Sequence, residues 1–322
     1  MQRERIALVR SRAPEEFDED LAPLRAALAR TGIEAVALPW DESADWSRFA
    51  AVLLESPWDY PGRSEEFLAW ARRAATESVL FNPFPMVEWN SDKRYLADLA
   101  ADGVPVVPST WTAPGEEWRA PAEGEYVVKP SVSCSAKDTA RYGPGAAERR
   151  RAHRHAGELL ERGRTVLTQP YQHAVDAQGE LSLVYLDGAY SHAVRRSALL
   201  KPGAGTQDGL LATATVTSCT AAGPELDCGD AVVKAVRSRF ESPLYARIDL
   251  VPGPGGGPLL LECEVIEPSL FLAHSPTAAD DLAAAVLRRL TSRSTRRSSA
   301  PGRPGTGLPD TGGGRDAPGA GG

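Results

Sequence analysis

The sequence lacks any apolar run that approaches the ~20 residues a membrane-spanning helix needs. Its start also lacks an apolar stretch of signal-peptide length, because Met1 is followed almost at once by an expected strand at 6–9. These two absences predict a protein that stays in the cytoplasm and does not contact the membrane.

Cysteine is scarce as well, and the chain carries no excess of positive charge. The four cysteines among 322 residues show neither metal-type spacing nor disulfide density, so we expect reduced thiols. A net charge of -7 argues against general nucleic-acid binding. What is present is an ordinary globular composition, 42% hydrophobic and 25% charged, in a chain long enough for two or three subdomains.

The first 85 residues alternate between strand and helix patterns. Strands are expected at 6–9, 33–38 and 51–54, and helices follow the first and third of them, the later one at 64–75. This alternation predicts a small α/β layer with a parallel sheet. Loops after such strands tend to face the ligand cleft, which draws attention to the aromatic and acidic loop at 57–61.

A second unit begins near Met86. We expect a helix from Ser91 to Gly103, and later helices over about 146–162, 230–240 and 279–290. Strands are expected between these helices at 104–107, 126–129, 165–168, 181–186, 189–194 and near 211–216. From 291 to 322 the chain offers almost nothing to bury, so this tail is predicted to be disordered.

Two late strands, 247–251 and 259–265, carry charged side chains at alternate positions. The Gly/Pro-rich segment 252–258 between them predicts a hairpin. Alternation puts Arg247 and Asp249 on one face of the first strand, and Glu262 and Glu264 on one face of the second. Carboxylates brought to ~4 Å repel by roughly 4 kcal/mol at an effective dielectric of ~20, so the cluster needs a cation. Oxygen ligands suit Mg²⁺ or Mn²⁺, and the arginine suggests a phosphate beside the metal.

Two lysines are candidates for binding phosphate. Lys93 lies near a predicted helix start, where free backbone amides already attract anions. Lys129 ends an apolar strand and precedes a loop of small residues at 131–137, but this loop lacks the glycines of a Walker loop. The alternatives are a solvated surface lysine at position 93 and an ordinary strand-end lysine before a loop at position 129.

Further polar positions follow the next strands. The strand expected at 165–168 ends in the segment Gln169, Pro170 and Tyr171. Its unpaired backbone groups could recognise an adenine edge. Glu180 could accept hydrogen bonds from ribose hydroxyls. Arg195 and Arg196 alternate between two strand faces, so only one of them can enter a given cleft, and His192 is more often structural than catalytic in this position.

In this order the motifs resemble the ATP-grasp superfamily, which includes glutathione synthetase and D-alanine ligase. The resemblance spans about 86–290 and implies an α/β (α+β) ATP-grasp fold, with a pre-ATP-grasp domain at 1–85 and a lid subdomain at about 104–165. It implies that ATP is bound by Lys93, Lys129, the 169–171 segment and Glu180, and that Arg247 contacts the transferred phosphate. It also implies that two Mg²⁺ ions are held by the carboxylates of Asp249, Glu262 and Glu264. Position 264 is usually Asn in the family, and the loop after Lys129 is usually richer in Gly.

Local strings are similar to those of a narrower group, the cycloserine-pathway cyclo-ligases, which close O-ureido-D-serine to D-cycloserine. The strings are PWDY at 57–60, WNSDKRYL at 89–96 and ECEVIEPSL at 262–270. This likeness implies a small amino-acid-like substrate and leaves room for a homodimer. Substrate contacts are expected from Asp59, from one of Arg195 and Arg196, and from the turn at 267–269.

The leading hypothesis is therefore an ATP-dependent ligase that activates a carboxylate as an acyl phosphate for capture by an amine-type nucleophile. Capture within one molecule and capture between two molecules both remain open. Two other hypotheses compete with it: a non-catalytic Mg-ATP-binding regulatory module, and an acidic hairpin that is only a solvated or calcium-binding surface.

Overall fold

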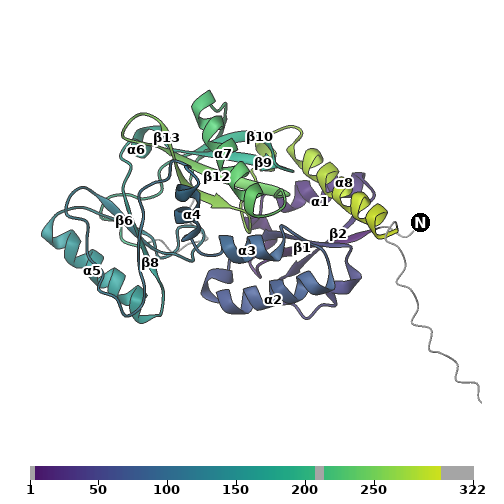
Figure 1. Ribbon diagram of the computed structural model, residues 1–322, viewed down its shortest axis with the longest axis horizontal. Coiled ribbons are helices and arrows are strands. Elements are labelled where there is room, and N and C mark those ends of the chain that lie inside the picture. Colours follow the sequence, from purple (N-terminus) through teal and green to yellow (C-terminus); the bar gives the residue numbers. More distant parts are fainter. Residues whose placement is uncertain (1–3, 207–213, 299–322) are drawn as a thin grey trace, which may run out of the picture.

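The computed structural model describes residues 4–206 and 214–298 of the chain. Within these residues the chain folds into three β-sheets flanked by helices (Figure 1). None of the helices in the described ranges is long and apolar enough to cross a membrane. Part of the strand expected near 211–216, and most of the tail expected from 291, lie outside the described residues.

The N-terminal unit is a parallel sheet in the order β2-β1-β3-β4, as the alternating pattern predicted. Its strands are β1 (Arg5–Arg10), β2 (Glu34–Pro39), β3 (Ala51–Ser56) and β4 (Leu80–Phe81). Its helices are α1 (Leu21–Arg30), α2 (Ser64–Glu77) and the short turns η1 (Glu15–Phe17), η2 (Trp46–Arg48) and η3 (Tyr60–Gly62). Apolar residues at helical spacing on α1 are buried, namely Leu21, Leu24, Ala27 and Leu28.

Two short helices open the second unit where the sequence predicted one. They are α3 (Phe84–Asn90) and α4 (Tyr95–Ala101). The prediction of a continuous helix from Ser91 was wrong, because Ser91 ends α3 and the Asp92 carboxylate accepts the backbone N–H of Arg94 at 3.0 Å. A strand expected at 104–107 is reduced to a single bridge between Val106 and Leu260, since prolines at 105 and 108 cannot donate to a ladder.

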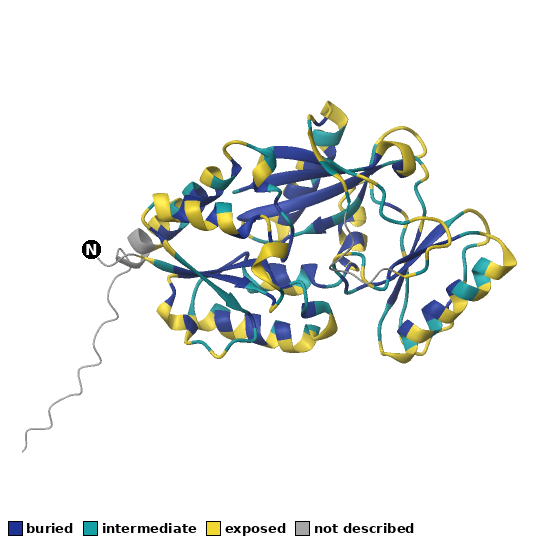
Figure 2. Cartoon of the chain, turned by 180° about the vertical axis from the view of Figure 1, so that it is seen from behind, coloured by how far each residue is buried: buried dark blue, intermediate teal, exposed yellow. Residues whose placement is uncertain are grey.

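A lid subdomain forms an antiparallel sheet in the order β5-β8-β6-β7. Its strands are β5 (Thr110–Thr112), β6 (Tyr126–Pro130), β7 (Ala140–Tyr142) and β8 (Val166–Pro170), covered by α5 (Ala146–Glu161). The lid has a hydrophobic cluster of its own, built around Trp118, Tyr126 and Leu159. Figure 2 shows this subdomain as a separate body, with buried strands facing the inner side of α5.

The C-terminal sheet is antiparallel, in the order β11-β10-β9-β12-β13. Its strands are β9 (Glu180–Leu186), β10 (Ala189–Arg196), β11 (Val216–Cys219), β12 (Tyr245–Pro252) and β13 (Pro258–Glu264). The accompanying helices are α6 (Val175–Gln178), α7 (Gly223–Arg239), η4 (Leu272–His274) and α8 (Ala278–Ser298). One buried cluster joins this sheet to the N-terminal unit, and α8 lies beside α1, where Arg30 pairs with Asp280 at 2.6 Å (Figure 1).

Helix α8 corrects the expected start of the tail. The prediction of disorder from 291 was wrong for 291–298, which continue the helix to Ser298. The Thr291 hydroxyl bonds the Leu287 carbonyl at 2.6 Å, and the chain meets no proline until position 301. The rest of the predicted tail, 299–322, lies outside the described residues.

Candidate active site

The predicted hairpin forms with its charged faces aligned. Strands β12 and β13 pair antiparallel, with Arg247 opposite Glu264 and Asp249 opposite Glu262. On the other face Ile248 and Cys263 are buried in the core. The sequence prediction that these carboxylates share one side of neighbouring strands is therefore confirmed.

Two buried asparagines attach the hairpin to the N-terminal unit. The Asn82 amide donates to the carbonyls of Tyr245 and Val265 at 3.0 and 2.9 Å, and its oxygen accepts the N–H of Leu244. Asn90 donates to the carbonyl of Cys263 at 2.8 Å and accepts the N–H of Val265 at 3.0 Å. Both sides of each amide are satisfied, so the hairpin has a fixed position against β4 and α3.

Asp249 lies at the centre of a charged network. It is 2% exposed, and its carboxylate accepts hydrogen bonds from the Ser182 hydroxyl at 2.7 Å and from Arg247 Nε at 3.0 Å. Arg196 Nη2 lies 2.8 Å from the same carboxylate. Burial alone would raise the pKa of Asp249, but the guanidinium groups of Arg196 and Arg247 bring it below its ordinary value. Asp249 is thus held ionised.

The two glutamates of β13 have different partners. Lys93 Nζ lies 2.8 Å from Glu262 Oε1 and donates to the Ser133 carbonyl at 2.5 Å, so Lys93 joins the hairpin to the loop after β6. Glu264 pairs with Arg247. Burial raises the pKa of Glu264 to about 7, although Arg247 opposes the shift.

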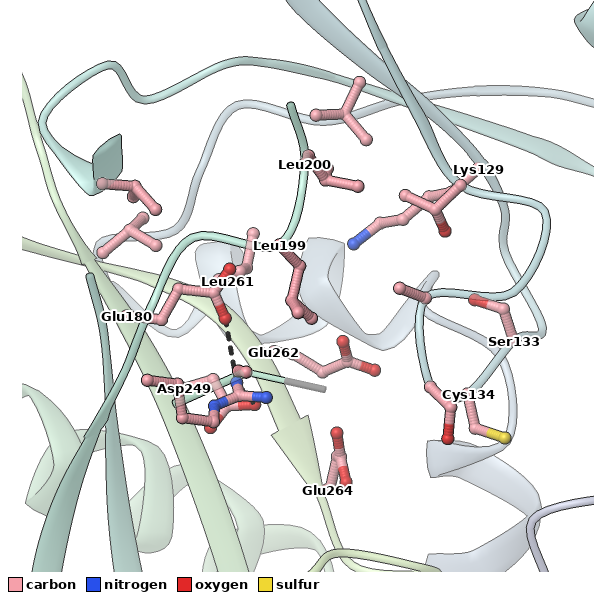
Figure 3. A pocket seen from close by; sticks show the side chains of 18 of the residues that line it. Lys129, Ser133, Cys134, Glu180, Leu199, Leu200, Asp249, Leu261, Glu262 and Glu264 are labelled. Carbon is pink, nitrogen blue, oxygen red and sulfur yellow. Dashed lines mark hydrogen bonds and ion pairs between the residues drawn. The ribbon is translucent and has the colours of Figure 1, made fainter. Parts of the chain in front are cut away.

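Lys129 differs from the other cations of the site. It is 7% exposed and lines the cavity, yet its ammonium makes no hydrogen bond or ion pair with any residue of the described ranges. Burial lowers the pKa of Lys129, and the field of Glu262 opposes this only in part. Figure 3 shows Lys129 on one side of the cavity, with Glu262 and Glu264 of β13 on another. An anionic ligand would supply the partner that Lys129 lacks.

Of the two neighbouring arginines on β10, only Arg196 enters the cavity. Arg196 Nη2 lies 2.9 Å from Glu180 Oε2, an ion pair drawn in Figure 3, and the same guanidinium reaches Asp249. Arg195 faces away, with Nη1 donating to the Gln178 carbonyl at 3.1 Å. Only one of the two arginines reaches the cleft, as expected. The prediction that Arg195 takes part in the reaction is corrected, because strand alternation turns its side chain outward.

The expected hinge also reaches the cavity. Gln169, Pro170 and Tyr171 line it at the end of β8. Gln169 is buried and donates to the Ser109 hydroxyl at 2.9 Å, and the guanidinium of Arg141 stacks 3.5 Å from the Tyr171 ring centre. Apolar side chains surround this end of the cavity, among them Val107, Val175, Leu199, Val251 and Leu261.

The carboxylates of the hairpin offer only oxygen donors, which suits Mg²⁺. In residues 4–206 and 214–298 no group of three or more Asp, Glu, His or Cys side chains has metal-binding geometry, since each hairpin acid is paired with Arg or Lys. Mg²⁺ commonly takes one or two protein carboxylates, with phosphate oxygens and water completing its shell. The donor set therefore fits a metal that arrives with a phosphate, and the metal role of the three acids stays a prediction.

Sequence reasoning pointed to the loops at 57–61 and 131–137 but missed the contact that joins them at the cavity wall. Trp58 and Cys134 both line the cavity, and the Cys134 thiol donates to the Trp58 carbonyl at 2.9 Å, linking the lid loop to the N-terminal unit. No local pattern marks such a contact. Asp59 was expected to meet substrate, but its carboxylate accepts a hydrogen bond from Trp40 Nε1 at 2.7 Å and it is not part of the lining. His192 is structural, as expected, bonded to the Leu270 carbonyl at 3.0 Å.

Comparisons with known proteins agree with this architecture. A family model described as "D-cycloserine synthetase DcsG, N-terminal domain" matches residues 6–82. The cycloserine biosynthesis protein DcsG of Streptomyces lavendulae is 40% identical over 301 residues, which are 88% of this chain and 98% of that protein. A crystal structure of D-cycloserine synthetase DcsG has a TM-score of 0.82 at 38% identity, covering 89% of this chain and 99% of the other.

A more distant solved structure shares the fold. The D-alanine–D-alanine ligase from Bacillus anthracis has a TM-score of 0.66 at 15% identity, covering 91% of this chain and 99% of the ligase. The fold is thus the α+β ATP-grasp fold, with the lid and the C-terminal sheet on two sides of one cavity.

Proposed function

Because this chain belongs to the cycloserine-synthetase family of ATP-grasp ligases, we propose that it closes an O-ureidoserine-type amino acid into a small ring at the expense of ATP. Family membership makes it an ATP-dependent ligase of antibiotic biosynthesis. The finer proposal concerns the substrate and the intramolecular course of the reaction. It is carried by the cavity in which Arg247, Asp249, Glu262 and the free Lys129 ammonium line one space.

The nucleotide would lie between the lid and the C-terminal sheet. Lys129 would bind phosphate oxygens, because its ammonium has no partner among the described residues. Lys93, which joins Glu262 to the loop after β6, would add a second positive charge. The backbone of the 169–171 segment would meet the adenine edge beside the apolar lining, and Glu180 would meet the ribose after releasing Arg196. Arg196 would then be free to contact the phosphate chain.

Asp249 and Glu262, with Glu264 beside them, would hold Mg²⁺. The metal, when bound, would neutralise part of the charge of the triphosphate. Asp249 is well suited to this role because its two arginine neighbours keep it ionised. Arg247 remains fixed between Asp249 and Glu264, with its guanidinium facing the space where a phosphoryl group would be transferred.

The first chemical step would join a substrate carboxylate oxygen to the γ-phosphorus of ATP, with ADP as the leaving group. Arg247 would stabilise the negative charge that develops on the transferred group. The product of this step is an acyl phosphate, which water must not reach, and the lid loop bonded to Trp58 through Cys134 closes one side of the cavity.

Ring closure would follow within the same molecule. The nitrogen bound to the side-chain oxygen attacks the acyl carbon, the C–O bond to phosphate breaks, and the nitrogen loses its proton. A ureido group also carries a carbamoyl unit that the cycloserine ring does not contain. Hydrolysis of that unit consumes one water and releases ammonia and carbon dioxide. An internal nucleophile is held near the acyl carbon without a second binding event, which lowers the entropic cost of the step.

The proposal is tested by incubating the protein with Mg-ATP and O-ureido-D-serine and following ADP release together with product mass. We expect the mass of the five-membered ring and one ADP for each ring. Glu262→Gln, which keeps the side-chain shape but removes a charge, should reduce turnover at least a hundredfold. If turnover required a second amino acid and gave a condensed product, the reaction would be a condensation and not a cyclisation. Nucleotide binding without any turnover would favour a regulatory module.

A further inference from the structure

Glu267 stands apart from the other acids of the cavity. It follows β13, is 7% exposed and lines the cavity. Its backbone carbonyl accepts a hydrogen bond from Trp58 Nε1 at 3.1 Å, and its carboxyl group is hydrogen-bonded by Tyr60 of the N-terminal unit. Neither contact brings a positive charge to the carboxyl group.

Every other acid of the wall meets a cation directly, but Glu267 does not. Asp249 and Glu264 pair with Arg247, Glu180 pairs with Arg196, and Glu262 pairs with Lys93. No ion pair of Glu267 is found in the part of the chain that the structure describes. Lys93 is the cation whose field reaches it, and that ammonium is already bonded to Glu262 and Ser133.

The surroundings make an isolated charge on Glu267 costly. Burial, with repulsion from Glu264, raises the pKa of Glu267 to about 8. A buried carboxylate that lacks a cation is stabilised when a cationic ligand group approaches it. Glu267 is thus an acceptor in the cavity that is suited to an ammonium group and has no cationic partner within residues 4–206 and 214–298.

We propose that Glu267, held by Tyr60, binds the α-ammonium group of the substrate and so determines that the enzyme takes α-amino acids. This inference rests on the proposed function, since it assumes that the carboxylate to be activated lies near Arg247. Arg247 Nη1 donates to the Ser269 carbonyl at 3.2 Å, so the guanidinium and the segment carrying Glu267 form one wall. In an α-amino acid the ammonium and carboxylate share one carbon, so the two anchors would fix both groups together.

The experiment measures binding of two compounds, O-ureido-D-serine and its analogue without the α-amino group, by calorimetry in the presence of Mg-AMPPNP. Wild-type protein should bind the amino acid at least tenfold more tightly than the analogue, because a charge-assisted hydrogen bond is lost with the amino group. In Glu267→Gln this preference should shrink to about threefold or less. Tyr60→Phe should reduce it less, and Glu77→Gln, an exposed glutamate on α2, should leave it unchanged.

Turnover adds a second readout. Glu267→Gln should raise KM for the amino acid at least tenfold and leave KM for ATP unchanged, whereas a merely structural role would change both and lower the melting temperature. An unaltered preference in Glu267→Gln would overturn the anchor. If the wild type bound the amino acid without cyclising it, only the proposed function would be contradicted. The ratio of the affinities for the amino acid and for its analogue would still test the role of Glu267. If the wild type bound neither compound, both proposals would be wrong.

Discussion

At the scale of single residues, Lys129 combines deep burial with the absence of a direct partner among the described residues. The folded protein carries the cost of burying this ammonium, as its lowered pKa reflects. If position 129 only supported the fold, an apolar side chain of similar length would be more stable there. The cost of burying the Lys129 ammonium is therefore consistent with a ligand that supplies the missing negative charge.

The substitution Lys129→Met separates stability from binding. Because the buried charge is removed and the length is kept, the nucleotide-free melting temperature should stay equal or rise. The Kd for Mg-ATP should increase at least tenfold, since a charged hydrogen bond contributes about 1.5–3 kcal/mol. Thermal unfolding and calorimetry measure the two effects. Lys137→Met, at an exposed lysine in the loop that follows β6, is the control and should change neither. A large loss of stability in Lys129→Met would contradict this account.

Glu55 shows a second conflict between burial and charge, outside the cavity. Its side chain is 8% exposed, and Glu55 Oε2 has no hydrogen-bond partner within the described residues. Burial raises the pKa of Glu55 well above 4.5, and the neighbouring Asp18 raises it further. The folded state therefore favours the neutral acid.

The sign of the pH effect follows from this shift. Because the pKa of Glu55 is raised in the folded state, the stabilising contribution of its neutral form is complete at pH values below the pKa of the unfolded chain, near 4.5. The contribution declines as pH rises from there toward the folded-state pKa, with a slope of up to about 1.4 kcal/mol per pH unit. Glu55→Gln mimics the neutral acid, so it should flatten this decline. Urea unfolding at pH 6 and pH 8 measures it, with exposed Glu19→Gln as control. An unchanged slope would show that Glu55 is ionised in the folded protein.

At the scale of elements, three consecutive backbone N–H groups of the segment between β13 and η4 bond to one side chain. Asp20 accepts the backbone N–H groups of Leu270, Phe271 and Leu272 at 2.6, 3.0 and 2.7 Å. Burial raises the pKa of Asp20, while these three N–H groups oppose the shift. The same segment carries Glu267 and Ser269 on the cavity wall, so its position matters for the site.

Replacing Asp20 by Asn should destabilise the protein by about 1–3 kcal/mol, because the amide nitrogen must face at least one N–H that then lacks an acceptor. Urea unfolding gives the free energy, and hydrogen exchange should show faster exchange at 270–272. Asp45→Asn tests an exposed acid with a local role, since Asp45 only caps η2. It should cost less than about 1 kcal/mol, and equal losses in the two variants would contradict the role of Asp20.

Element types were largely predictable from the sequence, whereas the break between α3 and α4 near the site was not. The hairpin of β12 and β13 follows from alternation and from its Gly/Pro turn, which are local signals. The break between α3 and α4 is set by the Asp92 side chain and by Lys93, whose backbone N–H bonds the Ser131 carbonyl at 2.9 Å. A contact with a residue almost forty positions away leaves no periodic signal.

At the scale of the whole molecule, the cavity is lined by the N-terminal unit, the lid and the C-terminal sheet together. The lid has its own core, whereas the other two units share two buried clusters. A ligand in the cavity would therefore connect a subdomain that packs separately with the rest of the chain.

Mg-AMPPNP at a hundred times its Kd should raise the free energy of unfolding by about 2.7 kcal/mol, by mass action on the folded state. Hydrogen exchange should slow in β6 of the lid and in β12 of the C-terminal sheet together, because both contribute cavity residues. AMPPNP without Mg²⁺ is the control and should stabilise the protein less. Absence of any shift with Mg-AMPPNP would support the hypothesis that the acidic hairpin is only a solvated or calcium-binding surface.

The sequence by itself determined the order of elements, the parallel N-terminal sheet, and the sharing of a strand face by Arg247 and Asp249. These are consequences of local periodicity, which each segment carries in its own residues. Tertiary structure alone decided which cation meets which acid, and that Arg196 rather than Arg195 enters the cavity. It also left Glu267 without an ion pair to any described residue. Such pairings join residues distant in the chain, and they depend on how sheets pack and on the cost of leaving a buried charge alone.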